Sequence, residues 1–191
     1  MTDTVPGPPP AYVLVDGENI DATLGSSILG RRPHPAERPR WERLLDFVAR
    51  TWQRTPKGLF FLAVNGELPM SFVQALTALG YRPVPLQGAP GQKVVDIAIQ
   101  RTLDELARRS DDVVLVSNDG DFTEHVARLL DDPSRMVGVV GFTEFRNLGL
   151  GALVDRGLQV FDLEDDVHAF QTRLPRMRVI AIDDFDPADF L

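Results

Sequence analysis

The sequence predicts an α/β protein in which a central, mostly parallel sheet is covered by helices on both faces, a three-layer αβα sandwich. Two observations predict this class. Short runs rich in β-branched and aromatic residues alternate along the chain with segments of helical periodicity. The short runs are also apolar at nearly every position, as expected for strands that are buried on both faces of a parallel sheet.

The elements follow one another in a regular strand and helix alternation. The strand candidates are Tyr12–Asp16, Leu59–Val64, Tyr81–Leu86, Asp112–Ser117, Met136–Phe142 and Leu158–Asp162. The helix candidates are Asp21–Leu29, Arg40–Arg54, Pro69–Leu79, Lys93–Arg109, Asp121–Leu130 and Glu144–Val154. Pro69 stands where a first-turn proline is tolerated, and Gly80 where a helix commonly ends in a left-handed residue. The glycine-rich stretch Leu148–Gly151 predicts a break in the last helix.

The length of 191 residues suits one globular domain with short tails. We expect a flexible, proline-rich N-terminus at 1–10, the folded domain at 11–165, and a C-terminal extension at 166–191 that ends in an acidic tail. The chain has no cysteine, which excludes disulfides, thiol catalysis and thiolate metal sites. Its apolar runs are too short to span a membrane, and the N-terminus lacks the features of a secretory signal, so the expected location is the cytoplasm.

The charge is acidic overall but unevenly distributed. The formal net charge is -8, which argues against a protein that coats nucleic acid through a generally basic surface. The segment Arg31–Lys57 nevertheless holds eight basic and three acidic residues. The acidic net charge therefore leaves room for a local basic groove.

Carboxylates gather where the predicted strands end. Asp16 ends the first strand, Asp119 and Asp121 follow the fourth, and Asp96 lies in the first turn of the helix after the third. Because ligands of open parallel sheets bind beyond the carboxyl ends of the strands, we expect these side chains to share one cleft. Oxygen ligands without His or Cys suit Mg²⁺ or Mn²⁺, and such a site suits metal-assisted phosphodiester hydrolysis.

Each carboxylate also has a purely structural interpretation. Asp16-Gly17 and Asp119-Gly120 are common turn pairs, and Asp121 with Glu124 resembles a capping box. Asp96 in a first helical turn is favoured by the helix dipole alone. Their coincidence at one sheet edge is what favours a functional site.

Three motifs together resemble the NYN domain family, a branch of the PIN-like nucleases. They are Val13–Asn19 (VLVDGEN), Lys93–Asp96 (KVVD) and Val116–Phe122 (VSNDGDF), and the resemblance covers roughly Ala11–Asp162. The combination in this order is more specific than any single motif. The resemblance implies a PIN-like fold with strand order 3-2-1-4-5 and a metal-dependent ribonuclease, which we expect to cut RNA internally.

The resemblance also implies roles for particular residues. The catalytic metal ligands would be Asp16, Asp96, Asp119 and Asp121, holding Mg²⁺ or Mn²⁺ directly or through water. Asn19 would orient a ligand or a substrate phosphate, Ser117 would hold the Asp119 loop by hydrogen bonding, and Lys93 would lie near the phosphate. The nucleophile would be a metal-activated water, and the products a 5′-phosphate and a 3′-hydroxyl.

The helix predicted at Arg40–Arg54 is the candidate RNA surface. Trp41, Leu44, Leu45, Val48 and Trp52 share one face, which we assign to the core. Arg40, Arg43, Arg50 and Arg54 share the opposite face with Phe47, and could bind single-stranded RNA by phosphate contacts and base stacking. The alternative is a solvated helix face with Phe47 covered by the loop Arg31–Pro39.

Other functions remain as alternatives. A phosphatase of the haloacid-dehalogenase type needs an aspartate two residues after its nucleophile, whereas Glu18 stands two residues after Asp16. A non-catalytic PIN-like scaffold that binds RNA or protein is the stronger rival. The acidic tail Asp183–Leu191 could bind a protein partner or fold back on the basic segment, or it could be solvated and unstructured. The three histidines have no metal-ligand spacing, although His125 could approach the carboxylates.

Overall fold

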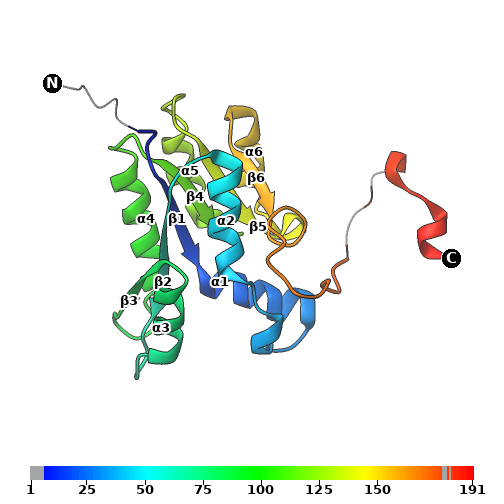
Figure 1. Cartoon of the computed structure of the whole chain (residues 1–191), viewed down its shortest axis with the longest axis horizontal. Helices are drawn as coiled ribbons and strands as arrows, with labels where there is room; N and C mark the ends of the chain where they lie inside the picture. Colours follow the sequence, from blue (N-terminus) through cyan, green and yellow to red (C-terminus); the bar gives the residue numbers. More distant parts are fainter. Residues whose placement is uncertain (1–6, 178–179, 181) are drawn as a thin grey trace.

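A six-stranded, fully parallel sheet forms the centre of the molecule, seen in a computed structural model that describes residues 7–177, 180 and 182–191. Its strands are β1 (Ala11–Asp16), β2 (Pro56–Ala63), β3 (Tyr81–Leu86), β4 (Asp112–Val116), β5 (Val137–Gly141) and β6 (Gln159–Asp162). The strand order is β3-β2-β1-β4-β5-β6 (Figure 1). The predicted order is confirmed, and β6 extends it beyond β5.

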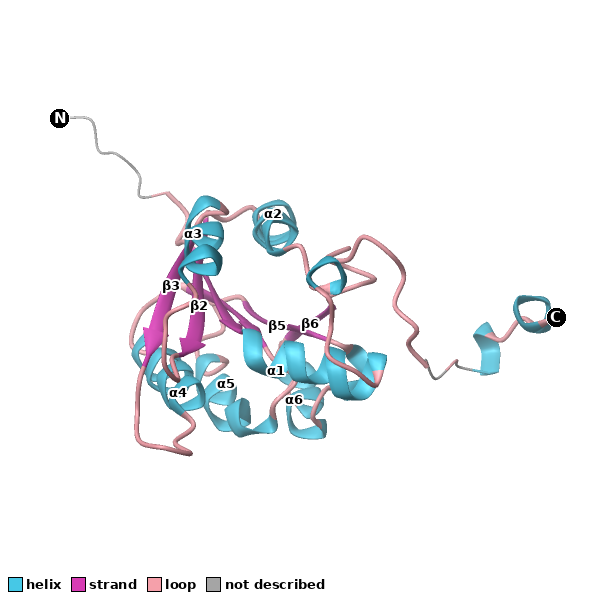
Figure 2. Cartoon of the chain, turned by 90° about the horizontal axis from the view of Figure 1, so that it is seen from below, coloured by secondary structure: helices cyan, strands magenta, loops and turns pink. Residues whose placement is uncertain are grey.

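Helices cover both faces of this sheet. They are α1 (Gly17–Ala22), α2 (Trp41–Trp52), α3 (Met70–Ala78), α4 (Val94–Leu106), α5 (Thr123–Leu129) and α6 (Leu148–Ala152). Figure 2 shows α2 and α3 on one side of the sheet and α4, α5 and α6 on the other. The three-layer αβα arrangement is therefore confirmed.

The position of each strand agrees with its composition. All five residues of β4 are buried, as are five of the six in β1, because these two central strands contact helices on both faces. β3 lies at one edge of the sheet and contains Pro83 and Pro85. Proline has no N–H to donate, and an edge strand tolerates it because no strand on its open side needs that hydrogen bond.

Two hydrophobic cores fill the space between the layers. One lies under α2 and includes Val13, Val15 and Leu44. The other lies under α4 and α5 and includes Leu14 and Ile99. The alternation of Val13, Leu14 and Val15 between the two cores follows from the two-residue period of a strand.

The amphipathic helix α2 agrees with its predicted core face. Trp41 and Trp52 are 8% and 5% exposed and pack with three aliphatic residues of the same face. The indole N–H of Trp52 donates to Oε1 of Gln159 on β6 at 2.9 Å. Both tryptophans therefore belong to the core, as predicted.

The sequence-based boundaries differ most from the structure at two helices, whereas β2 begins three residues earlier and α4 ends three residues earlier than predicted. Helix α1 begins at Gly17 rather than Asp21, and a π-helical segment follows it at Thr23–Leu29. The predicted break at Leu148–Gly151 is wrong: these residues form α6, and the chain is extended just before them at Arg146 and Asn147. The side chain of Asn147 caps α6 by accepting the N–H of Gly149 at 2.8 Å, which compensates for the weak helix propensity of two glycines.

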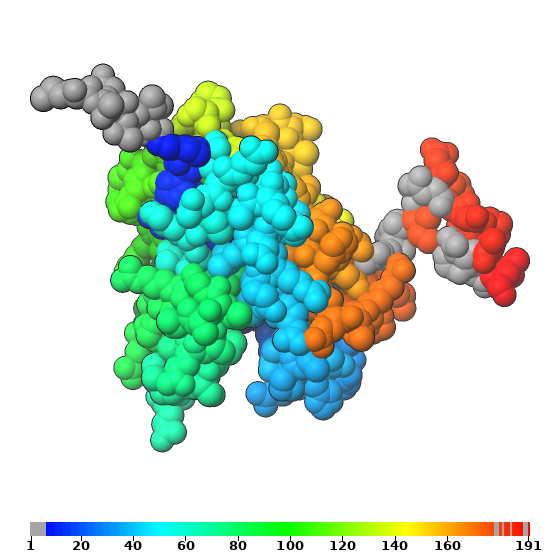
Figure 3. Space-filling model, in the orientation of Figure 1, coloured from blue at the N-terminus to red at the C-terminus, as the bar shows by residue number. Residues whose placement is uncertain are grey.

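Residues 163–176 form a segment that we call the C-terminal strap. It follows β6 and returns across the molecule beside α2 (Figure 3). Its apolar side chains enter the core under α2, among them Leu163, Val167 and Leu174. Part of the predicted 166–191 extension thus packs on the domain, whereas the chain from residue 182 onward is drawn apart from the body in Figures 1 and 3.

The helices are short. Within the described ranges, none is both long and apolar enough to cross a membrane.

Candidate metal centre

The predicted carboxylates meet at one edge of the sheet. Asp16 is the last residue of β1, and Asp119 and Asp121 lie in the turn after β4, which pairs directly with β1. Asp96 joins them from the first turn of α4. Parallel strands end at the same edge of a sheet, so the topology brings together residues from three distant parts of the chain.

Three of these carboxylates form a compact cluster. Asp96, Asp119 and Asp121 each offer one oxygen, and these oxygens all lie within 4.8 Å of one another. Ligand oxygens around an ion such as Mg²⁺, with bonds of about 2.1 Å, are separated by roughly 3 to 4 Å, so small side-chain movements suffice to bind one ion. The donor set is oxygen only and partly exposed, which fits a hard divalent cation that keeps several waters.

Asp16 lies beneath this cluster and is 2% exposed. Its burial, together with smaller electrostatic repulsion from Asp96 and Asp119, raises its pKa from 3.8 to about 6. Hydrogen bonds from Asn19 and Ser117 oppose this rise. Asp16 is therefore close enough to the cluster to interact with it, but it is not one of the three carboxylates that meet within 4.8 Å.

A network of hydrogen bonds holds the ends of β1 and β4 together. The Ser117 hydroxyl donates to Oδ2 of Asp16 at 3.1 Å and accepts the backbone N–H of Asp119 at 3.2 Å. Oδ1 of Asp16 accepts the N–H of Asn19, and Oδ1 of Asn19 accepts the N–H of Asn118 at 2.9 Å. Ser117 thus makes the contact to the Asp119 loop that the family resemblance implied.

The turn after β4 is capped by Asp119 rather than by Asp121. Oδ1 of Asp119 accepts the N–H of Asp121 at 2.9 Å and opens a single 3-10 turn at Gly120–Phe122. The proposed capping box that starts at Asp121 is therefore wrong. Because Asp121 does not serve as the cap, its carboxylate is available at the cluster, where it is 55% exposed.

Lys93 is the cation that the structure places at the cluster. Its ammonium lies 3.3 Å from Oδ2 of Asp96 and 3.2 Å from Oδ2 of Asp121, and its side chain is 69% exposed. Hydrogen bonds to Asp121 and Asp96 raise the pKa of Lys93. Lys93 therefore carries a positive charge directly beside the candidate ligands.

Sequence reasoning missed three residues that support this edge. Oδ1 of Asn118 accepts the N–H of Phe142 at 2.9 Å and joins the ends of β4 and β5. Oε1 of Glu18 accepts the N–H of Ala63 at the end of β2. Gln100 donates to the backbone carbonyl of Asp121. Asn118 and Glu18 lie inside the sequence motifs that predicted the site, and this placement could have marked them as residues of the same sheet edge.

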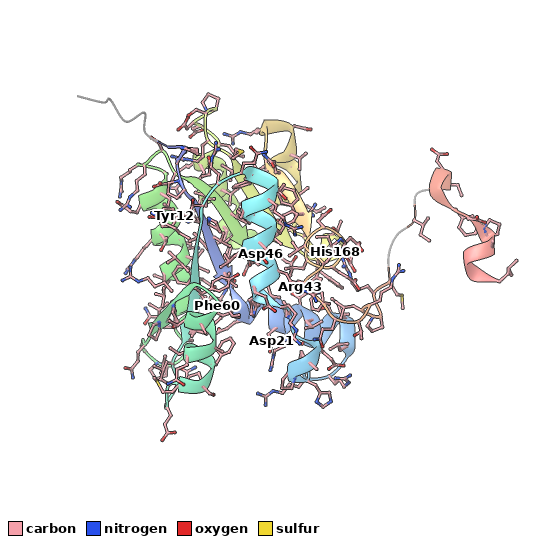
Figure 4. The ribbon with its side chains drawn as sticks, in the orientation of Figure 1. Tyr12, Asp21, Arg43, Asp46, Phe60 and His168 are labelled. Carbon is pink, nitrogen blue, oxygen red and sulfur yellow. The ribbon has the colours of Figure 1, made fainter. Side chains whose placement is uncertain are left out.

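The arginines of α2 are not gathered at the carboxylates. Arg43 donates to the carbonyls of His168 and Phe170 at 2.6 and 3.0 Å, so it binds the C-terminal strap; Figure 4 shows Arg43 and His168 side by side. Arg40 stands at the start of α2 beside Gln171 of the strap. Arg50 lies almost three turns further along and donates to the Asp46 carbonyl of its own helix. Their predicted contacts with RNA stay a prediction.

Phe47 and His125 both have partners within the protein. The Phe47 ring packs edge-on against Phe161 of β6, with ring centroids 5.0 Å apart. Phe47 is therefore partly buried by β6, rather than covered by the loop at 31–39. Nδ1 of His125 lies 2.8 Å from Oδ1 of Asp104 on α4, which turns the ring to a partner outside the cluster.

Comparisons with known proteins agree with this architecture. A crystal structure of a protein of unknown function from Vibrio parahaemolyticus RIMD 2210633 is similar in fold, with a TM-score of 0.61 and 22% identity over 83% of this chain and 94% of that one. No curated protein matches the chain. The NYN domain matches residues 10–155, a range that contains all four predicted carboxylates. Because this match covers most of the sequence, the chain belongs to the NYN domain family.

Proposed function

We propose that this protein is a metal-dependent ribonuclease that hydrolyses phosphodiester bonds of single-stranded RNA internally, with Mg²⁺ or Mn²⁺ as its cofactor. Membership of the NYN domain family implies the PIN-like nuclease superfamily, and the chain presents a carboxylate cluster at the expected sheet edge. The observation that carries the proposal is that Asp96, Asp119 and Asp121 bring oxygens within 4.8 Å of one another.

The residues divide into ligands and supports. Asp96, Asp119 and Asp121 would hold the ion, while Asp16 would bind it from beneath or through water. When bound, a divalent cation activates a water and neutralises charge on the attacked phosphate. Ser117 and Asn19 keep the Asp16 and Asp119 segments in register through the hydrogen bonds described above.

Substrate contacts form a further part of the proposal. Lys93 is exposed at the cluster and could contact a phosphate oxygen. Helix α2 runs from the carboxyl edge of the sheet, where β1 ends, to the amino edge, where β2 begins. Arg40, at the start of α2, therefore lies nearer to the carboxylate edge than Arg50. Arg40 is thus the better candidate of the two for a chain of RNA that crosses the cluster.

The test is cleavage of end-labelled single-stranded and hairpin RNA in Mn²⁺, in Mg²⁺ and in chelator. We expect wild type to cut single-stranded RNA with either metal and to lose activity in chelator, leaving 5′-phosphate and 3′-hydroxyl ends. Asp119→Asn should lose activity, because it removes one negative ligand of the ion. Asp155→Asn makes the same chemical change at an exposed position in the turn before β6, at the opposite, amino edge of the sheet, and should retain full activity.

Two outcomes would contradict the proposal. Cleavage at the wild-type rate by Asp119→Asn would exclude the cluster as the catalytic centre. RNA binding that is indifferent to metal and to Asp119, without cleavage, would instead indicate a non-catalytic PIN-like scaffold.

A further inference from the structure

Lys93 is a positively charged residue whose side chain contacts the carboxylates of the candidate metal centre. It is the residue immediately before α4, and its side chain projects from a loop rather than from a packed surface. Lys57 is the other lysine of the chain, and it lies over the Tyr12 ring at 5.2 Å, at the opposite, amino edge of the sheet. Lys57 can therefore serve as the control for Lys93 in experiments that remove or observe a lysine charge.

The Lys93 ammonium bridges two of the three clustered carboxylates. Its Nζ lies 3.3 Å from Oδ2 of Asp96 and 3.2 Å from Oδ2 of Asp121, two of the carboxylates that a divalent ion would use. Three carboxylates this close repel one another, and buried Asp16 adds to that repulsion. The ammonium offsets the repulsion and so helps to keep the ligands together without a metal.

An ammonium and a divalent ion cannot both stay at these carboxylates without electrostatic repulsion between the two cations. At the dielectric constant of water, the repulsion between a single and a double charge about 4 Å apart corresponds to roughly a 30-fold change in a binding constant. The Lys93 side chain is 69% exposed and has a flexible four-carbon stem, so it can move away when an ion arrives.

We propose that Lys93 is the internal counter-cation of this centre, which competes with the divalent ion for Asp96 and Asp121 and is displaced when the ion binds. This inference rests on the proposed metal centre, but it concerns the chain's own residue. Lys93 acts as a positioning residue: it holds the ligands in place before the metal binds, and it weakens the affinity of the centre for metal.

The first test is calorimetric titration of Mn²⁺ into wild type, Lys93→Met, Lys93→Arg and Lys57→Met at low ionic strength. Lys93→Met should bind Mn²⁺ about 3- to 30-fold more tightly than wild type, because it removes the competing charge. Lys93→Arg keeps the charge and should bind like wild type. Lys57→Met loses the same charge away from the carboxylates and should also bind like wild type.

The second test observes the two lysines directly. Reductive methylation with ¹³C-formaldehyde keeps the lysine charge and gives one side-chain NMR signal for Lys93 and one for Lys57, assigned with the variants Lys93→Arg and Lys57→Arg. Titration with diamagnetic Mg²⁺ should shift the Lys93 signal toward that of a solvated lysine and leave the Lys57 signal unchanged.

The outcomes separate this inference from the proposed function. If Asp119→Asn loses Mn²⁺ binding but Lys93→Met binds like wild type, the metal centre stands and the role of Lys93 is overturned. A Lys93 signal that does not move with Mg²⁺ overturns it equally. If wild type binds no Mn²⁺ at all, both the metal centre and the inference fail.

Discussion

The sharpest prediction concerns Arg176, whose side chain is 1% exposed at the end of the C-terminal strap. Its guanidinium donates to Oδ1 and Oδ2 of Asp162 at 2.7 and 2.6 Å, to Oε1 of Glu144 at 2.7 Å, and to Glu164 at 3.2 Å. It also lies over the Phe142 ring at 5.2 Å. One side chain thus joins the strap to the ends of β5 and β6.

The perturbation is Arg176→Met, which keeps an unbranched side chain and removes the charge. The substitution leaves three carboxylates, 5%, 17% and 10% exposed at Asp162, Glu144 and Glu164, without this cation. Removing one partner of a buried, hydrogen-bonded ion pair costs about 3 to 5 kcal/mol. We expect the free energy of unfolding at pH 7 to fall by that amount.

The loss should depend on pH with a defined sign. Burial alone would raise the pKa values of Asp162 and Glu144, but hydrogen bonds, first from Arg176 and then from backbone N–H groups, hold both below their usual range. Their stabilising contribution is therefore present above the unfolded pKa values near 4 and is lost as the pH falls through the lower folded values. In the variant these carboxylates can protonate instead, so the difference between the two proteins should shrink as the pH falls from 7 to about 4.

Urea unfolding followed by tryptophan fluorescence measures this difference, because Trp41 and Trp52 are both buried in the core that the strap contacts. Arg173→Met is the matched control: it makes the same change at an exposed position of the strap, and it should alter stability by less than about 0.5 kcal/mol. The reasoning is refuted if Arg176→Met is as stable as Arg173→Met, or if their difference does not shrink in acid.

Two further predictions concern the edge of the sheet. Asp16→Asn, measured in chelator, should be more stable than wild type by about 1 to 3 kcal/mol at pH 7, because the folded state raises the pKa of Asp16 from 3.8 to about 6. The wild type becomes less stable than the variant as the pH rises from about 4 to 6, because Asp16 ionises less readily in the folded state. The two proteins should therefore be equally stable at pH 4. A variant that is still more stable than wild type at pH 4 would contradict the raised pKa of Asp16. Gly120→Ala should lose about 1 to 2 kcal/mol of unfolding free energy in urea, since the new Cβ would clash with the Asn147 amide and displace the cap of α6. Gly151→Ala, whose Cβ would meet no atom within 4 Å, is the control and should be neutral or stabilising.

Local sequence was sufficient to predict the strands, most of the helices and the sheet edge at which the carboxylates gather. Buried parallel strands read as continuous apolar runs, and the position of Asp16 or Asp119 at the end of such a run already predicts the sheet edge where it lies. The amphipathic pattern of α2 likewise separated Trp41 and Trp52 from the arginines. The break predicted at Leu148–Gly151 was wrong because glycine propensity ignores the cap that Asn147 supplies.

What the sequence alone determined, therefore, is the order of the elements, their buried faces and the edge at which the acidic residues meet. The tertiary structure decided the partner of each cation: Arg43 binds strap carbonyls, Lys93 bridges two aspartates, and Arg176 is buried among three carboxylates. The physical reason is that the periodicity of buried positions is a property of residues that are close in sequence. A long charged side chain instead binds partners that folding brings together, here from up to 127 positions away.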